Sequence, residues 1–283
     1  MLKITACLDG SIGTNIVCDY AAWFSQKLNS PLDFLHVIDT PKVQAPQDLS
    51  GAIGLGSREK LLKELIELDK RKGKIELEHG QILLEEARMY VLENFNLHAN
   101  VFQRHGSLLE TIVDLEKNIR VLVMGKNGTH TEFSSKKIGS QIENIVRATH
   151  KPVLITSSPF QQPGSFLVAF DGSDTTRRCV ERISSSSLLK GLVAHLVYVG
   201  TFNTEIETQL SWAKNQLELQ GFNTSIHILN GEADKAIVDY SIAHQIDIIV
   251  VGAYGHSKIR QFFIGSTTTK IIMKSLKPVL LLR

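Results

Sequence analysis

The sequence has three cysteines, no long apolar run and almost no net charge. The cysteines show no C-x-x-C spacing, so we expect no disulfide framework and a reducing, cytoplasmic location. No run approaches the roughly 20 apolar residues that a membrane helix needs, and Asp9 interrupts the N-terminus too early for a signal peptide. A formal charge of +2 argues against nucleic acid or an anionic membrane as the main partner.

Patterns for common catalytic and metal chemistries are also missing. The P-loop pattern G-x-x-x-x-G-K-[ST] does not occur, and no Ser-His-Asp or Cys-His arrangement follows from spacing. We therefore predict no catalytic residue and at most a slow ATPase. His130 and Glu132 supply too few ligands for a usual zinc site, so a solvated loop is favoured there and no metal is assigned.

What the sequence does contain is a repeat. Asp9-Gly10-Ser11 recurs 162 residues later at 171–173, and Lys151-Pro152-Val153 recurs 126 residues later at 277–279. Most of the 36-residue difference lies between the second and third expected strands of the first copy. Residues 157–164, rich in Ser, Pro and Gln, indicate a linker. The predicted domains are residues 1–157 and 165–283.

Each copy predicts five strands that alternate with helices. The expected strands are 2–8, 32–38, 100–104, 121–124 and 152–156, then 166–170, 192–199, 224–229, 248–251 and 279–282. The expected helices are 14–28, 58–94, 107–117, 138–148, 175–189, 204–220, 232–244 and 267–275, with possible breaks near Gly73 and Gly80, and 39–57 is expected to be a loop. Such alternation implies parallel sheets covered on both faces, with the ligand crevice where strand order reverses.

The stretch 248–269 is the candidate site. An apolar strand ends at Gly252, Gly255 follows, and Gly265-Ser266 opens a helix. Glycines let backbone N–H groups approach an anion, and a helix N-terminus adds donors and the positive end of a dipole. A lone G-x-x-G after a strand is weak evidence for phosphate binding, because glycine ends many strands for steric reasons. The Gly-Ser at a fixed distance and the strand-end Asp171 make the combination more specific.

Together these features resemble a tandem universal stress protein, with two such domains in one chain. The resemblance rests on the Asp-Gly-Ser turns, the strand 35–38, the glycine pattern and the final Lys-Pro-Val strands, and it covers both halves. Nucleotide-binding members carry G-2x-G-9x-G-(S/T), which Gly252, Gly255, Gly265 and Ser266 match. The resemblance implies two doubly wound α/β domains, each with a five-stranded parallel sheet in the order 3-2-1-4-5 and helices on both faces.

The resemblance also implies ATP as ligand, with Mg²⁺ as an option. Asp171 would bind the adenine or its edge of the pocket, and Val199 would contact the base. The implied ATP-binding residues are Ala169, Asp171, Val199, Val251, Gly252, Tyr254, Gly255, Gly265, Ser266, Thr267 and Thr268. Tyr254 stands where many nucleotide-binding relatives carry a histidine.

The first copy departs from the pattern. Ten residues, not nine, separate Gly128 from Gly139, and Gln141 and Ile142 replace the two threonines after the Gly-Ser. Lys126 and its neighbour could compensate by reaching a phosphate. The candidate degenerate site comprises Asp9, Ile38, Gly125, Gly128, Gly139 and Ser140. A copy that keeps the fold for pairing, or accepts another ligand, is favoured here over ATP binding.

The favoured function is an ATP-binding stress-response regulator in which the nucleotide shifts conformation or partner affinity. The alternative is a nucleotide-independent interaction module whose N-terminal crevice binds another ligand or none. A third possibility, an enzyme that adenylates a substrate, lacks an identifiable group at the α-phosphate. Terminal strands pair across a dimer in relatives, so an internal pseudo-dimer and a homodimer are both open.

Overall fold

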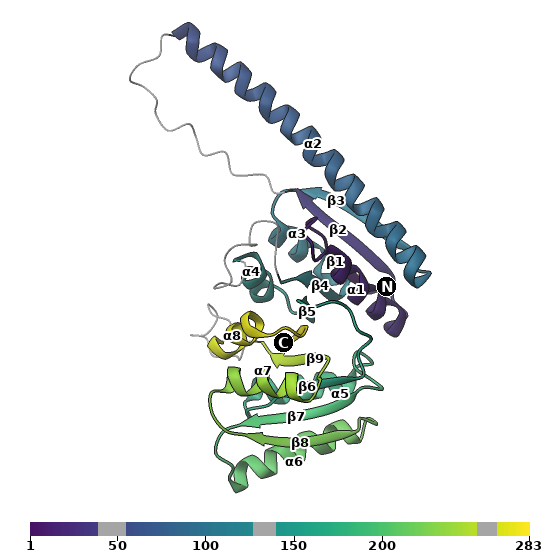
Figure 1. Ribbon diagram of the computed structural model, residues 1–283, viewed down its shortest axis with the longest axis vertical. Coiled ribbons are helices and arrows are strands. Elements are labelled where there is room, and N and C mark those ends of the chain that lie inside the picture. The colour runs from purple at the N-terminus through teal and green to yellow at the C-terminus, as the bar shows by residue number, and fades with distance from the viewer. Residues whose placement is uncertain (39–54, 127–139, 254–264) are drawn as a thin grey trace.

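The computed structural model describes residues 1–38, 55–126, 140–253 and 265–283 (Figure 1). The strands are β1 (Lys3–Cys7), β2 (Leu32–Ile38), β3 (Ala99–His105), β4 (Ile119–Gly125), β5 (Val153–Thr156), β6 (Ser165–Ala169), β7 (Val193–Val199), β8 (Thr224–Leu229), β9 (Ile248–Gly252) and β10 (Val279–Leu282). The helices are α1 (Thr14–Leu28), α2 (Leu55–Phe95), α3 (Leu108–Leu115), α4 (Ser140–Ala148), α5 (Asp174–Ser185), α6 (Thr204–Glu218), α7 (Ala233–Ala243) and α8 (Ser266–Lys274), and a 3-10 turn covers Glu116–Asn118.

All ten strands form one sheet, in the order β3-β2-β1-β4-β5-β10-β9-β6-β7-β8. Within each half the strands are parallel and follow the order 3-2-1-4-5, so the predicted fold class is confirmed. The halves meet where β5 and β10 pair antiparallel, with Leu154 opposite Leu280. The C-terminal strand therefore has a neighbour on each side, and β3 and β8 are the outer strands of the described sheet.

Burial on both faces explains the continuous apolar strands. Along β9, Ile248 and Val250 enter the core layer formed with α1, α2, α5 and α6, whereas Ile249 and Val251 enter the layer formed with α3, α4, α7 and α8. Alternate residues of a strand point to opposite faces, so neither face of this strand can carry a polar pattern. Each fully buried Ile or Val contributes about 1.5–3 kcal/mol.

Helix α2 has no break at Gly73 or Gly80, where the sequence had suggested possible breaks. It continues over 41 residues. A Cβ atom at Gly80 would lie 2.1 Å from Gln103 Nε2 and 2.5 Å from His36 Cδ2. The glycine is therefore a point of close approach between the helix and strands β2 and β3. The N-terminal part of α2 projects well beyond the sheet (Figure 1).

Helix α5 is shorter than predicted, because it ends at Ser185 rather than near residue 189. Ser184 is buried, and its hydroxyl donates to the Val180 carbonyl oxygen at 2.8 Å. Of the four serines at 184–187, Ser184 therefore belongs to the core and Ser185 ends the helix. Hydroxyls that bond the preceding turn weaken a helix interior, which favours termination here.

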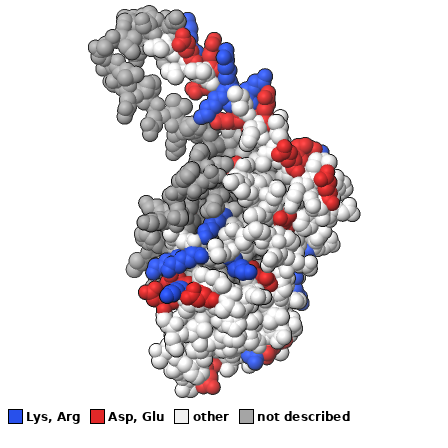
Figure 2. All heavy atoms as spheres, in the orientation of Figure 1, with Lys and Arg blue, Asp and Glu red and all other residues white. Residues whose placement is uncertain are grey.

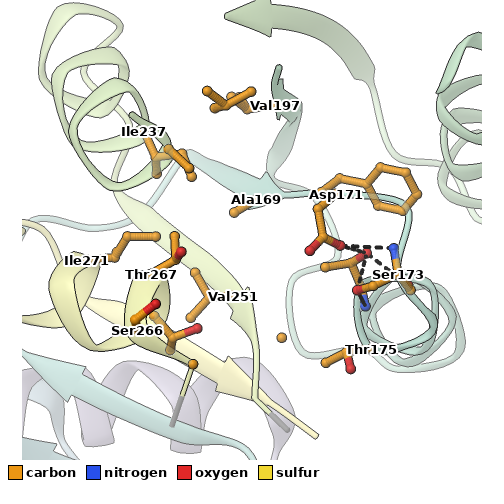
Figure 3. A pocket seen from close by; sticks show the side chains of 17 residues that line it. Ala169, Asp171, Ser173, Thr175, Val197, Ile237, Val251, Ser266, Thr267 and Ile271 are labelled. Atoms are coloured by element: carbon orange, nitrogen blue, oxygen red, sulfur yellow. Dashed lines mark hydrogen bonds between the residues drawn. The ribbon is translucent and has the colours of Figure 1, made fainter. Parts of the chain in front are cut away.

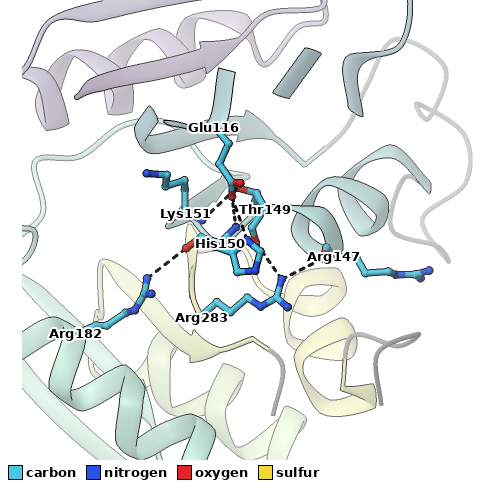
Figure 4. Close-up of polar contacts among 7 residues, drawn as sticks. All are labelled: Glu116, Arg147, Thr149, His150, Lys151, Arg182 and Arg283. Carbon is cyan, nitrogen blue, oxygen red and sulfur yellow. Dashed lines mark hydrogen bonds and ion pairs between the residues drawn. The ribbon is translucent and has the colours of Figure 1, made fainter. Parts of the chain in front are cut away.

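Polar contacts around the entry to β5 tie the two halves together (Figure 4). The Glu116 carboxylate accepts hydrogen bonds from the backbone N–H of His150 at 2.5 Å and the hydroxyl of Thr149 at 3.0 Å. From the other half, Arg182 donates to the His150 carbonyl at 3.3 Å and Arg283 to the Arg147 carbonyl at 3.2 Å. Two arginines of the second half therefore bind main-chain carbonyls of the first.

Candidate functional site

A cavity opens at the carboxyl ends of the second-half strands (Figure 3). Strand β6 pairs with β7 on one side and β9 on the other, so strand order reverses between β6 and β9. The cavity has a volume of about 540 Å³, which is within the range of small-molecule sites. It is lined by Ala169, Phe170, Asp171, Ser173, Thr175, Thr176, Val197, Val199, Ala233, Ile237, Val251, Gly252, Gly265, Ser266, Thr267, Thr268 and Ile271.

One side of this cavity is apolar. Val197 and Val251 come from the sheet, Ile237 from α7 and Ile271 from α8. These side chains continue the core layer beneath α7 and α8, which holds their rotamers in place. The arrangement suits a flat, weakly polar group that is removed from water on binding.

The N-terminus of α8 adds a polar part to the wall, next to Val251 and Ile271 (Figure 3). Gly265 precedes the helix, and no side chain within the described residues caps it. The first intrahelical hydrogen bond runs from Thr269 N to Gly265 O at 2.9 Å. The N–H groups of Ser266, Thr267 and Thr268 therefore have no carbonyl acceptor within the helix. Three hydroxyls accompany them, and the helix dipole is positive here. These groups can bind an anion.

Asp171 lies at the rim in a turn that fixes its carboxylate. Oδ1 accepts hydrogen bonds from Ser173 N and Thr176 Oγ1, both at 2.9 Å. Gly172 has φ +78°, a conformation that strains other residues. The first half builds the same turn, because Gly10 has φ +76° and Asp9 Oδ1 accepts from Ser11 N at 3.0 Å.

Gly252 is required where β9 passes the start of α5. A Cβ atom there would lie 2.9 Å from Thr175 Cγ2 and 3.3 Å from Thr175 O. Backbone cannot move away as a flexible side chain can, so a larger residue would push α5 away from β9. The glycine therefore sets the width of the cavity floor.

Nine of the eleven residues predicted for the ATP site line this cavity. They are Ala169, Asp171, Val199, Val251, Gly252, Gly265, Ser266, Thr267 and Thr268. Tyr254 and Gly255 lie outside the described residues. The sequence interpretation missed Thr175 and Thr176 of α5 and Ala233 and Ile237 of α7. The predicted helices 175–189 and 232–244 both follow a strand of this half, and that position was the available signal. Val197, two residues before Val199 on the same strand face, follows from the period of a strand.

In the first half, some positions that correspond to the cavity lining lie at element ends, and one is a core residue. Asp9, Ile38 and Gly125 follow or end β1, β2 and β4, and Ser140 begins α4, whereas Gly128 and Gly139 lie outside the described residues. Ile142, at the place of Thr268, is buried in the core.

The idea that Lys126 reaches a phosphate needs correction. Its ammonium donates to the carbonyl oxygens of Met273 at 2.6 Å and Ser275 at 3.0 Å, at the C-terminal end of α8. Burial lowers the pKa of Lys126. A cation at this end of a helix is attracted by the dipole and by the last carbonyls, so a tertiary contact holds the side chain that the sequence left free.

Ion pairs hold α7 against α8 behind the cavity. Asp234, buried in the first turn of α7, lies 2.5 Å from Lys274 Nζ and 3.8 Å from Lys270 Nζ. The hydrogen bond from Lys274 lowers the pKa of Asp234, and the same contact raises the pKa of Lys274. These pairs fix the helix whose N-terminus faces the cavity.

Reactive and metal-binding groups are scarce in the described part of the chain. Burial raises the pKa of Cys7, Cys18 and Cys179 to about 12, so each thiol stays protonated. Across residues 1–38, 55–126, 140–253 and 265–283, no group of three or more His, Cys, Asp or Glu side chains is placed to hold a metal ion. Over the same ranges no helix has the length and apolarity to cross a bilayer.

Comparisons with known proteins agree with this architecture. The model of the universal stress protein family matches residues 1–157 and 164–283. The chain is 35% identical to universal stress protein Slr1230 of Synechocystis sp. over 287 aligned positions, covering 100% of both chains. A universal stress protein structure from Archaeoglobus fulgidus has a TM-score of 0.71 at 20% identity, covering 99% of this chain and 98% of that one. One from Pseudomonas aeruginosa, described as putative in its name, has a TM-score of 0.63 at 16% identity, covering 99% and 93%. The chain belongs to the universal stress protein family and carries two of its domains in tandem.

Proposed function

We propose that the second-half cavity binds ATP and that the protein is a nucleotide-dependent regulator in the stress response. The observation that carries this proposal is the N-terminus of α8, which no described side chain caps and whose three hydroxyl residues line the same cavity as an apolar wall. An adenine nucleotide has the matching chemistry, because a flat base and a polyphosphate lie at its two ends. The glycine spacing shared with nucleotide-binding members of the family supports the same ligand.

In this proposal the base packs among Val197, Val199 and Ile237, and the Asp171 carboxylate accepts a hydrogen bond at the rim. The phosphates lie at Ser266–Thr268, where hydrogen bonds to charged oxygens contribute about 1.5–3 kcal/mol each. Of the described lining residues, only Asp171 carries a carboxylate. Any Mg²⁺ would therefore be held largely by phosphate and water oxygens.

Hydrolysis is slow in this proposal. The described lining residues include no His, Lys or Arg, and the Oδ1 atom of Asp171 is already occupied by the turn. Phosphoryl transfer depends on cations and a positioned water to stabilise the transition state. Binding without turnover suits a regulator, in which ATP stabilises one conformation or partner-binding state of the cytoplasmic protein.

The first half serves pairing rather than ATP binding in this proposal. Its Lys126 binds the C-terminal end of α8, and its Ile142 is a core residue. The β5–β10 ladder would make the two domains an internal pseudo-dimer. The expected stoichiometry is one ATP per chain.

Isothermal titration of the full chain with ATP tests these statements. We expect saturable binding near one site per chain, lost in Gly252→Val and unaffected by Asp9→Ala, which alters the equivalent turn of the first half. Native mass spectrometry of freshly purified protein gives an independent measure of bound nucleotide. No binding by the unaltered chain would reject the ATP proposal and favour a nucleotide-independent interaction module.

A further inference from the structure

Helix α2 has a segment without a counterpart in the second half. A Cβ atom added at Gly10 would meet His79 of α2, and one added at Gly172 would meet Gln209 of α6. Each helix therefore covers the Asp-Gly-Ser turn of its own half. Helix α6 begins five residues before Gln209, whereas α2 begins twenty-four before His79. The nineteen residues 55–73 are therefore additional, and at 1.5 Å per residue they span about 28 Å.

Large apolar side chains on α2 face solvent in a regular row. The row comprises Leu61, Leu65, Leu68, Ile75, Ile82 and Met89, and Ile66, which is 53% exposed, lies beside it. Their exposed fractions run from 42% for Met89 to 65% for Ile75. Successive spacings of four, three and then seven residues place Leu65 at an a position and the other five at d positions of one heptad register, whose later a positions hold Lys72, His79 and Glu86.

The row favours a partner because contact with another apolar surface would remove these exposed side chains from water. Ion pairs within the helix, Lys72–Glu76 at 3.7 Å and Lys74–Glu78 at 3.8 Å, stabilise it by only about 0.2–0.5 kcal/mol each. A helix that merely extended into solvent would be polar all round. The spacing of Leu61, Leu65 and Leu68, at consecutive d, a and d positions, instead matches the seam of a short coiled coil.

We propose that the projecting part of α2 is an antiparallel coiled-coil surface whose partner is α2 of a second copy of this chain. Charged residues of both signs lie along this segment (Figure 2). Their positions decide the orientation. With Leu65 opposite Leu68 of the second copy, Glu64 lies beside Arg71 of that copy, and the two-fold axis repeats the pair.

The parallel arrangement is unfavourable for the same residues. An in-register parallel pair would place Lys72 against Lys72 at a core position. It would also place Glu64 beside Asp69 of the second copy, where two acidic flanks repel. In the antiparallel pair the Lys72 stem covers Leu61 of the second copy, and its ammonium reaches water. Because α2 begins at Leu55, the overlap of the two helices ends near residue 78, and Ile82 and Met89 lie outside it.

This interface is separate from the nucleotide cavity and from the joint between the halves. The terminal strands β5 and β10 are already paired with each other inside the chain, so they offer no unpaired strand to a second copy. Two chains could therefore form a homodimer through α2 without using the terminal strands. It is also independent of the proposed ATP binding, and tests on nucleotide-free protein separate the two.

Sedimentation velocity of the full chain, without nucleotide and over a range of concentrations, tests the proposal. The chain mass is 31.5 kDa, so we expect a species of twice that mass to grow with concentration. Leu65→Glu combined with Leu68→Glu should leave monomer only. Leu219→Glu is the matched control, because Leu219 is 76% exposed but lies just beyond α6. A monomeric unaltered chain, or a dimer that survives the double substitution, would overturn the proposal.

Charge exchange distinguishes the two orientations. Glu64→Arg and Arg71→Glu should each weaken the antiparallel dimer at least severalfold, and the two together should restore it. In a parallel pair, Glu64→Arg alone would strengthen association, because position 64 would then face Asp69. That outcome would overturn the antiparallel arrangement. Far-UV circular dichroism of every variant verifies that α2 stays helical.

Discussion

The two halves share one topology but differ in the residues at the start of the helix that follows their fourth strand. Both build the Asp-Gly-Ser turn with glycine at a positive φ, and both place a helix N-terminus after strand four. In the second half, three consecutive hydroxyl residues face a cavity. In the first, the counterpart of the last is the core residue Ile142. The repeated scaffold thus preserves its turn geometry, while the side chains at one helix start differ between the two copies.

The largest expected effect comes from Gly252→Val. The added atoms would overlap Thr175, including its backbone carbonyl, and displace the α5 start from β9. We expect at least a hundredfold loss of ATP affinity by isothermal titration. Gly125→Val is the corresponding change in the first half and should leave ATP affinity near that of the unaltered chain. Equal losses from both substitutions would mean that the halves are not functionally distinct.

Asp171→Ala should have the next largest effect. Removing a hydrogen bond between a charged group and the ligand costs about 1.5–3 kcal/mol, a loss of about 10- to 150-fold in affinity. The matched control Asp9→Ala removes the same turn carboxylate from the first half. Titration calorimetry on both variants, with thermal unfolding recorded in parallel, separates lost contact from lost structure. If Asp9→Ala lowered ATP affinity more, the site assignment would be reversed.

Asp234→Asn should lower stability by about 1 kcal/mol, because a buried carboxylate loses its pairing with a half-exposed lysine. The pKa of Asp234 is lowered in the folded chain. Its contribution is therefore present above the ordinary carboxyl pKa and is lost as pH falls through the lowered value. Urea unfolding at neutral pH and at pH 3 should show the difference between variant and unaltered chain shrinking in acid. An unchanged difference would argue against the ion pair as its source.

Lys126→Met should have the smallest effect. The substitution keeps the apolar stem but removes a cation at the α8 C-terminus, worth about 0.3–1 kcal/mol. We expect a slightly lower midpoint in denaturant and near-normal ATP affinity. A tenfold or larger loss of affinity would instead reveal coupling between the first half and the α8 N-terminus, and would bring the halves functionally together.

The features that depend on neighbours along the chain could be predicted from the amino-acid sequence. Apolar strands, the Asp-Gly-Ser turns, the helix start at Ser266 and the tandem repeat all follow from short-range patterns. They are local because turn conformation, helix capping and strand period are properties of a few consecutive residues. The parallel order of each half follows from the same alternation together with the rules of crossover connections and the family resemblance.

Contacts between distant segments could not be predicted from the sequence and became visible in the folded chain. Gly80 looked like a helix break, but it lies against His36 and Gln103, where a side chain would collide. Lys126 looked free for a phosphate, but it binds carbonyls 147 and 149 residues away. Burial and pairing depend on which surfaces meet after the chain folds, and no short pattern encodes that meeting.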